Sequence, residues 1–302
     1  MNLDFKMKCE KFMYIYMYEL EKALNNNIKA LKDITFQVHE ANVDKPLKEF
    51  IKEFIENGYN KIPLDTMEKV MEIDRDNNKT LLSYRDFKDI YIEKVYLPSE
   101  LTEELKQYRS MSRDSVYTDP DLYFEITDGI NKYYISVELK STKDNSIPGS
   151  SIQQIIPNEW VIFIRHNKSG INVVTGRYIH SINSKMQFPD RSPRPKVSFR
   201  ELEEWNNNNR YETDSKVIYK TNLDDERTKY QLLSNWQDYL ADRWIEILFK
   251  DSIKKNEPWF NNNLRIFTLK FIDRYETLSA DEKENYKIML QKLIKEYEIP
   301  TP

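Results

Sequence analysis

The chain has 302 residues, 32% of them charged and 39% hydrophobic, with a formal net charge of −4 at pH 7. This length allows one large domain or two small ones with a substantial core. No apolar run is long enough to cross a bilayer, and the first residues are too mixed in polarity for a secretory signal. One cysteine and three scattered histidines exclude a disulfide framework and a Cys/His zinc site, and together these features indicate a reducing cytoplasm.

The glycine content and the charge balance argue against further classes. Only five glycines occur, and none opens a GxxxxGK[ST] phosphate loop or a GxGxxG dinucleotide turn, so a P-loop NTPase or a Rossmann enzyme is not expected. The negative net charge argues against a protein that holds nucleic acid through global basicity. It permits a protein with one locally positive cleft.

The first third of the chain has the periodicity of helices. Phe12, Tyr16 and Leu20 fall on one face of a first helix. A second helix is predicted between Asp44, which caps it, and Gly58, which ends it. Shorter helices are predicted to start at capping residues near Asp65, Ser83 and Ser99.

From about residue 115 the hydrophobic period changes from 3.6 to 2. One short strand contains Leu122, Phe124 and Ile126, and after a TDGIN turn a second contains Ile135, Val137 and Leu139. A short helical turn (SSIQQII) follows, and then two apolar strands, WVIFI and INVVTGRYI. The spacing of Ser198 and Glu201 is that of a capping box and predicts a helix start.

The last third returns to helical periodicity. A strong apolar stripe runs from Leu233 to Leu248. Ser279 and Glu282 have capping-box spacing and begin a final helix, whose buried face is expected to include Leu290 and Leu293. The sequence therefore predicts a strand-rich centre wrapped by N- and C-terminal helices, without repeats or a clear linker.

The candidate chemistry lies in the two central strands. Pro120 and Asp121 precede the first strand, and Glu138, Leu139 and Lys140 end the second. Mg²⁺ takes one or two carboxylates plus water and substrate phosphate, so Asp121 and Glu138 are the predicted ligands, with the Leu139 carbonyl a third. Lys140 would orient or deprotonate the attacking water and offset charge near a phosphate.

The length of the turn decides whether this site can exist. A two-residue turn at Asp128-Gly129 puts Asp121 diagonal to Glu138 on one face of the hairpin. A four-residue DGIN loop, with Thr127 opposite Lys132, puts Asp121 directly opposite Glu138. A three-residue loop would put the two carboxylates on opposite faces and remove the site.

This arrangement resembles the catalytic signature of the PD-(D/E)xK nucleases, to which most type II restriction endonucleases belong. The resemblance covers about residues 113–205, where Pro120-Asp121 and Glu138-x-Lys140 both match. It implies an α/β fold: a restriction-endonuclease-like core with a mixed central β-sheet flanked by N- and C-terminal helices. We expect one nuclease domain over residues 1–302, with mainly helical parts at 1–112 and 206–302 around the 113–205 core.

The resemblance also implies an activity, namely Mg²⁺-dependent hydrolysis of double-stranded DNA at a short sequence in the cytoplasm of a prokaryote. A homodimer is expected because two active sites are needed to cut two strands, and palindromic sites mirror protein two-fold axes. A cognate DNA methyltransferase is expected in the same system, although not necessarily bound to this chain.

Candidate DNA contacts come from a basic stretch and from the segment behind Lys140. Residues 184–200 carry a local excess of +4, and prolines keep this segment extended. Arg191, Arg194 and Lys196 are the predicted recognition residues, since the arginine fork suits phosphate and guanine edges. Arg113 is a weaker candidate for a phosphate contact.

The SSIQQII segment has a structural and a functional interpretation. Ser150 and Gln153 have capping-box spacing, and we predict a capping role for Ser150. Ser151 and Gln154 are instead candidates for contact with the DNA backbone or the attacking water.

Two other functions remain open from the sequence. A structure-specific or repair nuclease of the same fold would leave no fixed-position products. A helical nucleic-acid-binding module, with Glu138 and Lys140 on a solvated strand face, would bind DNA without regard to Mg²⁺ and would tolerate Lys140→Ala.

Overall fold

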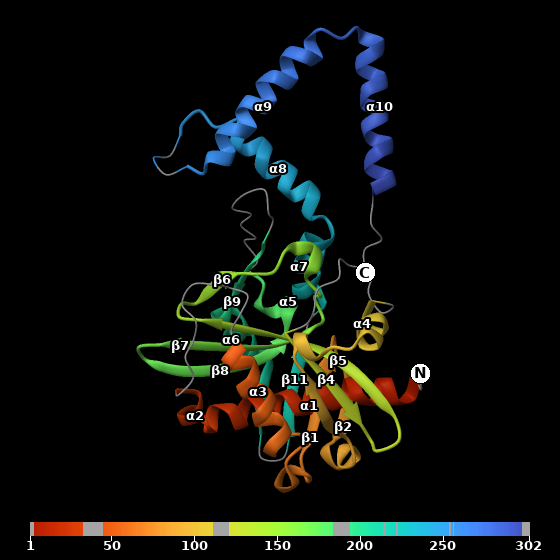
Figure 1. The fold of residues 1–302 in the computed structure, drawn as a ribbon, viewed down its shortest axis with the longest axis vertical. Helices are drawn as coiled ribbons and strands as arrows, with labels where there is room; N and C mark the ends of the chain where they lie inside the picture. Colours follow the sequence, from red (N-terminus) through yellow and green to blue (C-terminus); the bar gives the residue numbers. More distant parts are fainter. Residues whose placement is uncertain are drawn as a thin grey trace.

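The protein combines helices with two mixed β-sheets, so the expected α/β class is confirmed (Figure 1). This computed structural model describes residues 3–32, 45–110, 121–183, 194–213, 216–221, 223–253, 255 and 257–297. None of its described helices is both long enough and apolar enough to cross a membrane.

The larger sheet has five strands in the order β3-β4-β5-β7-β8. Their bounds are β3 Tyr91–Tyr96, β4 Leu122–Thr127, β5 Lys132–Thr142, β7 Trp160–Asn167 and β8 Gly170–Arg177. The pair β5–β7 is parallel and the other neighbours are antiparallel, so the central sheet is mixed. The strand expected at INVVTGRYI ends at Arg177, and its last residues form the short helix α5, Tyr178–Ser181.

The β4–β5 hairpin has the four-residue turn. Thr127 pairs with Lys132, and the register continues to Leu122 opposite Val137. Asp128 Oδ1 accepts from the Asn131 N–H at 2.7 Å, and Gly129 has φ +88°, a conformation that costs glycine little. Local turn chemistry therefore selects the register that directs Asp121 toward Glu138.

A smaller four-stranded sheet, ordered β10-β11-β1-β2, contradicts two helix predictions. Its bounds are β10 Arg210–Glu212, β11 Lys216–Thr221, β1 Val70–Arg75 and β2 Asn78–Ser83. The helices expected from Asp65 and Ser83 are single 3₁₀ turns, each followed by a strand. Asp76 and Asn77 both have positive φ, as in a tight hairpin turn. This Asp-Asn pair was the local sequence signal for a hairpin between β1 and β2, and the helix prediction overlooked it. The parallel β1–β11 pairing joins segments far apart in sequence, which local periodicity cannot reveal.

Helix α1, Leu3–Asn26, lies within the main hydrophobic core. Phe12, Tyr16 and Leu20 are buried as predicted, and so are residues on its other faces. Phe124 of the larger sheet and Met71 of the smaller sheet belong to the same core. A helix buried on nearly all sides is apolar nearly all round, and residues 12–20 of α1 have this character because residues of both sheets pack around them.

Most of the remaining helices flank the sheets, whereas the last two of the chain extend away from them, so the expectation that the C-terminal helices wrap the centre is wrong for those two (Figure 1). In the first part of the chain they are α2 Ile28–Lys32, α3 Lys45–Gly58 and α4 Glu103–Ser110. Those that follow α5 are α6 Phe199–Asn209, α7 Leu223–Ser234, α8 Trp236–Leu248, α9 Trp259–Glu276 and α10 Ala280–Tyr297.

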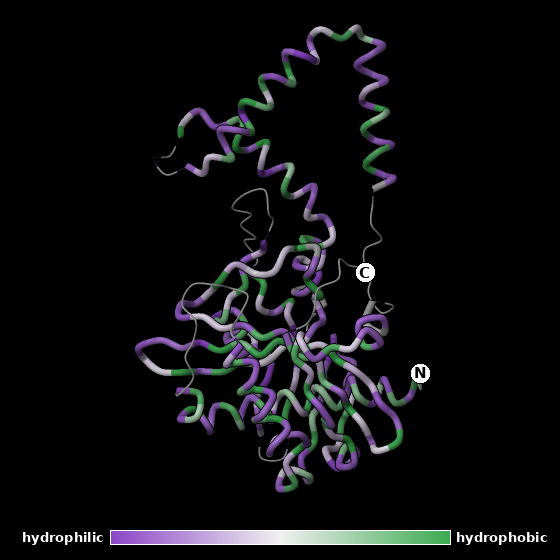
Figure 2. The backbone as a smooth tube through the Cα atoms, viewed as in Figure 1, coloured by the Kyte–Doolittle hydropathy of each residue, from purple (hydrophilic) through white to green (hydrophobic). Residues whose placement is uncertain are grey.

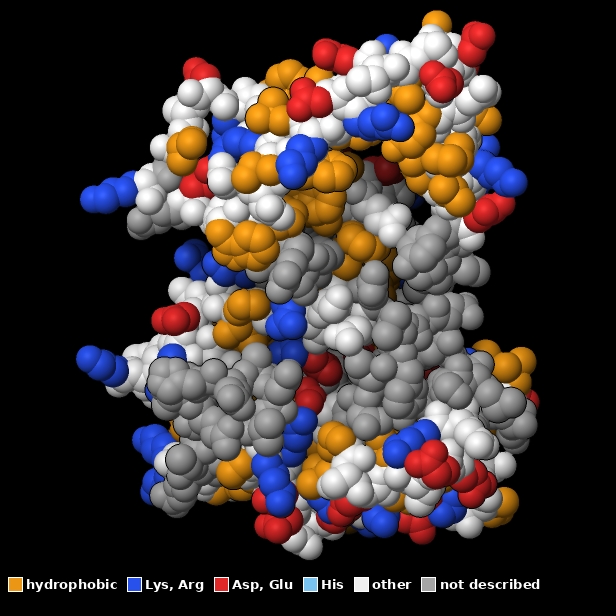
Figure 3. Space-filling view, turned by 45° about the horizontal axis from the view of Figure 1, so that its top comes forward, with side chains coloured by type: hydrophobic (Ala, Val, Ile, Leu, Met, Phe, Trp, Pro, Cys, Tyr) orange, Lys and Arg blue, Asp and Glu red, His pale blue; other side chains and the backbone are white. Residues whose placement is uncertain are grey.

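Helices α6 and α10 start where predicted: Ser198 caps α6 through the Glu201 N–H, and Ser279 and Glu282 form a full capping box at α10. The predicted cap of α3, Asp44, lies outside the described residues. The expected burial of Leu290 and Leu293 is wrong, because they are 39% and 50% exposed. Hydrophobic stretches recur along α9 and α10 (Figure 2), and apolar side chains gather over the upper part of the molecule, where these helices lie (Figure 3).

Glu212 connects the edge strand β10 to α1, and this contact is sensitive to acid. The pKa of the Glu212 carboxyl falls from 4.5 to about 2, mainly because Lys69 donates a hydrogen bond to it. Hydrogen bonds from Lys22 and Tyr18 lower this pKa further, and partial burial opposes them. A lowered carboxyl pKa stabilises the fold above pH 4.5, and this stability is lost as pH falls toward 2.

We therefore expect Glu212→Gln to remove stability at neutral pH and to flatten the acid limb of the stability profile. Urea unfolding of both proteins between pH 3 and pH 7 measures this. The control is Glu276→Gln, which removes an exposed carboxylate of α9. Parallel profiles for Glu212→Gln and wild type would contradict the assignment.

Candidate active site

Asp121 and Glu138 come together where β4 begins and β5 approaches its end. The register that pairs Leu122 with Val137 places Asp121 opposite Glu138. Asp121 Oδ2 accepts a hydrogen bond from the Leu139 N–H at 3.0 Å, which fixes the carboxylate against β5. The predicted neighbour Pro120 lies outside the described residues.

Each carboxylate has a lysine partner. Lys140 Nζ lies 2.5 Å from Glu138 Oε1, and Lys48 Nζ of α3 lies 2.5 Å from Asp121 Oδ1. All four side chains are largely buried, with exposures of 14% to 21%. The structure thus gathers the three predicted catalytic residues and adds one that the sequence did not single out.

Ser150 completes the contacts around Glu138. Its hydroxyl donates to Glu138 Oε1 at 3.2 Å and lies 3.5 Å from Lys140 Nζ. The capping role predicted for Ser150 is wrong: the 3₁₀ turn Ile152–Gln154 has Ser151 as its N-cap, and the Ser151 side chain makes no capping bond. One turn of 3₁₀ helix is too short to need the predicted capping box, so the hydroxyl of Ser150 is available to the carboxylate.

Burial and neighbouring charge shift the titration of this cluster. Burial raises the pKa of Glu138, and the nearby Asp121 carboxylate acts in the same direction against the opposing influence of Lys140. Burial alone would lower the pKa of Lys140, but the carboxylates of Glu138 and Asp121 raise it overall. The two carboxylates therefore stand in an environment that favours a nearby positive charge.

The donor set fits Mg²⁺. Two adjacent carboxylates are the usual protein contribution to a magnesium site, with water and substrate oxygens filling the remaining positions. The N–H and C=O of one strand residue point the same way, so the bond from the Leu139 N–H to Asp121 turns the Leu139 carbonyl toward the same place. Among the described residues no group of three or more His, Cys, Asp or Glu side chains gathers as a metal site, so this carbonyl is the third candidate ligand.

Two supports of the site come from elements distant in sequence. Lys48 belongs to a polar stripe on α3, at spacing i, i+4, i+8, in which Lys52 contacts Glu100 and Glu56 accepts from the Val95 N–H. This polar stripe, which runs beside the apolar face of α3, is the sequence pattern that could have indicated a role for Lys48. The buried Tyr178 of α5 accepts from the Ser150 N–H at 3.4 Å, and no local pattern predicted this contact.

A two-stranded ribbon lies beside Ser150 and carries some of the predicted DNA contacts. It consists of β6, Ser146–Pro148, and β9, Lys196–Ser198, with Pro148 paired to Lys196. Arg194 and Lys196 are exposed, while Ser151 and Gln154 are partly buried on the adjoining 3₁₀ turn. The remaining two predicted contacts, Arg113 and Arg191, lie outside the described residues.

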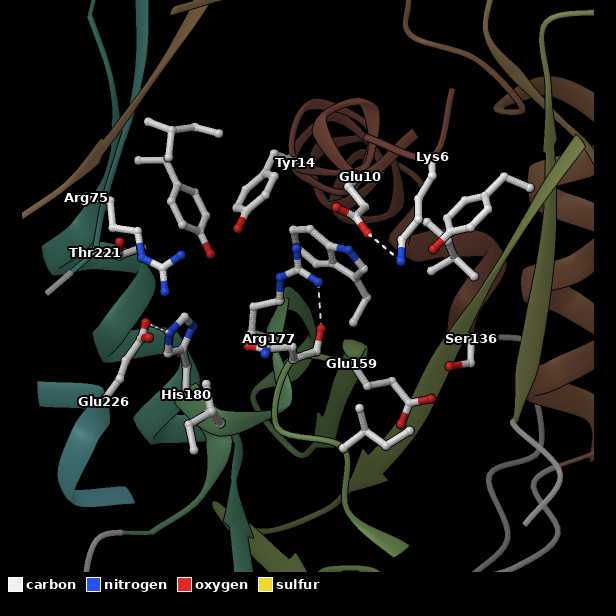
Figure 4. Close-up of a pocket in the computed structure, with 18 of the residues that line it drawn as sticks. Lys6, Glu10, Tyr14, Arg75, Ser136, Glu159, Arg177, His180, Thr221 and Glu226 are labelled. Carbon is white, nitrogen blue, oxygen red and sulfur yellow. Dashed lines mark hydrogen bonds and ion pairs between the residues drawn. The ribbon is translucent and has the colours of Figure 1, made fainter. Parts of the chain in front are cut away.

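A separate cavity of about 520 Å³ has neither Asp121 nor Glu138 in its lining (Figure 4). Arg177 lies over the ring of Trp160 at 3.8 Å, and His180 Nε2 contacts Glu226 Oε1 at 2.8 Å. Burial lowers the pKa of His180 although Glu226 opposes this. Helix α5 borders both places: its Tyr178 accepts a hydrogen bond from the Ser150 N–H, and its His180 lines the cavity.

Gly149 permits the close approach that positions Ser150. Its N–H donates to the Pro195 carbonyl at 2.8 Å, and a Cβ there would lie 2.5 Å from the same backbone oxygen. We expect Gly149→Ala to lower the free energy of unfolding by about 1–3 kcal/mol, since backbone must move to relieve the overlap.

Urea unfolding measures this change, and Gly58→Ala is the matched control because its Cβ would meet nothing within 4 Å. Equal stabilities of Gly149→Ala and Gly58→Ala would show that the segment before Ser150 is not tightly held.

Neither the comparison with protein-family models nor that with curated proteins finds a match for this chain. The observation that bears on its function is the geometry of the acidic cluster, formed by Asp121 and Glu138 with Lys48, Lys140 and Ser150.

Proposed function

We propose that this protein is a type II restriction endonuclease, a Mg²⁺-dependent enzyme that hydrolyses double-stranded DNA at a short sequence. The observation that carries the proposal is the juxtaposition of Asp121, Glu138 and Lys140 at one place on a mixed sheet. The strand order around them supports it further, because an antiparallel hairpin followed by a crossover to a parallel strand is the core expected of a PD-(D/E)xK nuclease. The register also puts both carboxylates and the lysine on one face of the β4–β5 hairpin.

Hydrolysis of a phosphodiester joins a water oxygen to phosphorus and breaks one P–O ester bond, with a proton passing from the water to the leaving oxygen. When bound, Mg²⁺ supplies positive charge that favours ionisation of the water and stabilises charge developing on phosphorus. Asp121 and Glu138 would hold the ion together with the Leu139 carbonyl. Lys140 would orient the water, and Ser150 would keep Glu138 in position through its 3.2 Å hydrogen bond.

The ribbon of β6 and β9 would follow the DNA beside the scissile phosphate. Lys196 is exposed and sits opposite Pro148, two residues before Ser150. Positive side chains in such a place provide phosphate contacts that set the register of the duplex, and base contacts then add sequence selectivity. Arg194, two residues before β9, would serve this role as well, and Arg191 belongs to the same basic segment of the sequence. Ser151 and Gln154 would contact the backbone from the adjoining turn.

Cleavage of long unmethylated duplex DNA tests the proposal. We expect discrete fragments with Mg²⁺ and intact DNA with EDTA. Glu138→Gln and Lys140→Ala should each lower the cleavage rate by about 100-fold or more, because each removes a group that acts on the reacting atoms.

Glu93→Gln is the control, since it changes an exposed glutamate on the neighbouring strand β3. Undiminished cleavage by Glu138→Gln would refute the assigned site. Magnesium-dependent cleavage without fixed positions would instead identify a structure-specific nuclease of the same fold.

Lys48 provides a second test on the opposite side of the cluster. Loss of its ammonium leaves Asp121 without its 2.5 Å partner and removes positive charge from the place where a phosphate would bind. We expect Lys48→Ala to cleave at least about tenfold more slowly than wild type at saturating Mg²⁺.

Lys52→Ala is the matched variant, one helical turn away, because Lys52 contacts Glu100 rather than the acidic cluster. It should cleave at the rate of wild type. Equal rates for the two variants would assign Lys48 a purely structural role.

A further inference from the structure

The cavity of about 520 Å³ lies where the two sheets and helix α1 meet (Figure 4). Residues of β1 and β11 line it from the smaller sheet, and residues of β5, β7 and β8 line it from the larger one. Helix α1 contributes Lys6, Glu10 and Tyr14. Its volume is within the range of about 300–1,000 Å³ that small-molecule sites occupy. The cavity is therefore large enough to hold a small organic ligand.

Both sheets leave an opening at this place. The parallel strands β1 and β11 end here, and their last residues, Arg75 and Thr221, pair with each other and line the cavity. Ligands of α/β proteins bind beyond the carboxyl ends of such strands, where a crevice forms. In the larger sheet β7 begins opposite Val137, so on that side residues 133–136 of β5 border the cavity instead of a neighbouring strand.

Two guanidinium groups at the cavity have no carboxylate partner in the part of the chain that the structure describes. Arg177 donates to the backbone carbonyl of Asn158 at 2.6 Å, and the exposed side chain of Arg75 is in no hydrogen bond or ion pair with a described residue. Burial raises the pKa of the Tyr230 hydroxyl, and the charges of Arg177 and Arg75 both oppose this, so both lie near that hydroxyl. Two neighbouring cations of this kind favour an anion, and the arginine fork suits the oxygens of a phosphate.

Aromatic rings form walls of the cavity. The ring of Tyr14 meets those of Trp160 and Tyr219 edge-on, with centroids 5.2 and 5.1 Å apart. Arg177 lies flat over the Trp160 ring at 3.8 Å and adds a second planar surface. Such walls suit a flat ring, which gains burial and stacks on aromatic or guanidinium planes.

The polar groups differ between the two sides of the cavity. Figure 4 shows Arg75 on one side, and Ser136 and Glu159 on the other. The carboxylate on the side of Arg75, Glu226, already contacts His180 at 2.8 Å. A hydroxyl and a carboxylate accept hydrogen bonds from amino groups, such as the exocyclic amine of a nucleobase. The cavity thus offers cations for a phosphate, flat walls for a ring and acceptors for the edge of a base.

We propose that this cavity binds a free nucleoside monophosphate, with its phosphate at Arg75 and Arg177 and its base between the aromatic walls, toward Ser136. A nucleotide inside a DNA strand presents the same ring, but its phosphodiester carries a single negative charge. A terminal phosphate carries about 1.5 to 2 negative charges at pH 7, which matches two guanidinium groups. This site is separate from the acidic cluster and does not depend on the nuclease function.

Isothermal titration calorimetry of the full chain in EDTA, without DNA, tests the site. The probes are AMP, GMP and CMP, whose bases all carry an exocyclic amine. We expect at least one of them to bind once per chain with a dissociation constant in the micromolar range. The matching nucleoside, which lacks the phosphate, and inorganic phosphate, which lacks the ring, should each bind at least about tenfold more weakly, because each makes only part of the contacts.

Arg75→Ala should weaken the binding of that nucleotide at least about tenfold, because it removes a charge-assisted contact to the phosphate. Its urea unfolding should match wild type, since the Arg75 side chain is exposed and makes no contact that the fold would lose. Arg85→Ala is the matched control, because Arg85 is also exposed, pairs with Glu68 and is not part of the cavity lining. The control should bind the nucleotide as wild type does.

Failure of all three nucleotides to bind would overturn the proposal, as would equal affinities of Arg75→Ala and Arg85→Ala. Binding of a short single-stranded oligonucleotide without binding of the free nucleotides would also overturn it and assign the cavity to nucleic acid.

Glu138→Gln separates this inference from the proposed function, because Glu138 does not line the cavity. We expect this variant to bind the nucleotide as wild type does. A protein that binds the nucleotide and leaves DNA intact in Mg²⁺ would support the cavity site and refute the nuclease. A protein that cuts DNA and binds none of the nucleotides would do the reverse.

Discussion

The register of the β4–β5 hairpin is the constraint on which the candidate site depends. Thr127 pairs with Lys132 across a turn that Asp128 and Gly129 stabilise, and every later pair follows from that first one. Because side chains alternate between the faces of a strand, a turn one residue shorter would send Asp121 to the face opposite Glu138. A few hydrogen bonds at one end of the hairpin thus decide whether two carboxylates meet at the other end.

Once the carboxylates meet, their charge has to be balanced. The protein does this with Lys48 and Lys140, which approach from α3 and from β5 itself, and with the hydroxyl of Ser150. Buried carboxylates without such partners would be strongly unfavourable. A cation and a phosphate could exchange with these partners, because both the negative and the positive groups they need are already in place. The same contacts that stabilise the cluster therefore supply the charged groups that the proposed nuclease function would use.

The rest of the molecule supports this arrangement through contacts between distant segments. Helix α1 occupies the core between residues of both sheets, and α5 supports Ser150 through Tyr178. Helices α9 and α10 differ from the rest of the molecule, because none of their described side chains is buried and many of their apolar side chains are exposed.

The sequence by itself determined the local features of this protein. Turn chemistry and period-2 alternation located the β4–β5 hairpin, capping boxes located the starts of α6 and α10, and the order of acidic and basic residues placed Asp121, Glu138 and Lys140 at strand ends. Only the tertiary structure decided the pairing of β1 with β11, the arrival of Lys48 at Asp121 and the exposure of α10. The physical reason is range: caps, turns and alternation act between residues a few positions apart, whereas sheet order and helix packing depend on contacts between segments separated by tens to hundreds of residues. An amphipathic pattern indicates that a helix has an apolar face suited to packing, but it does not identify the segment that covers that face.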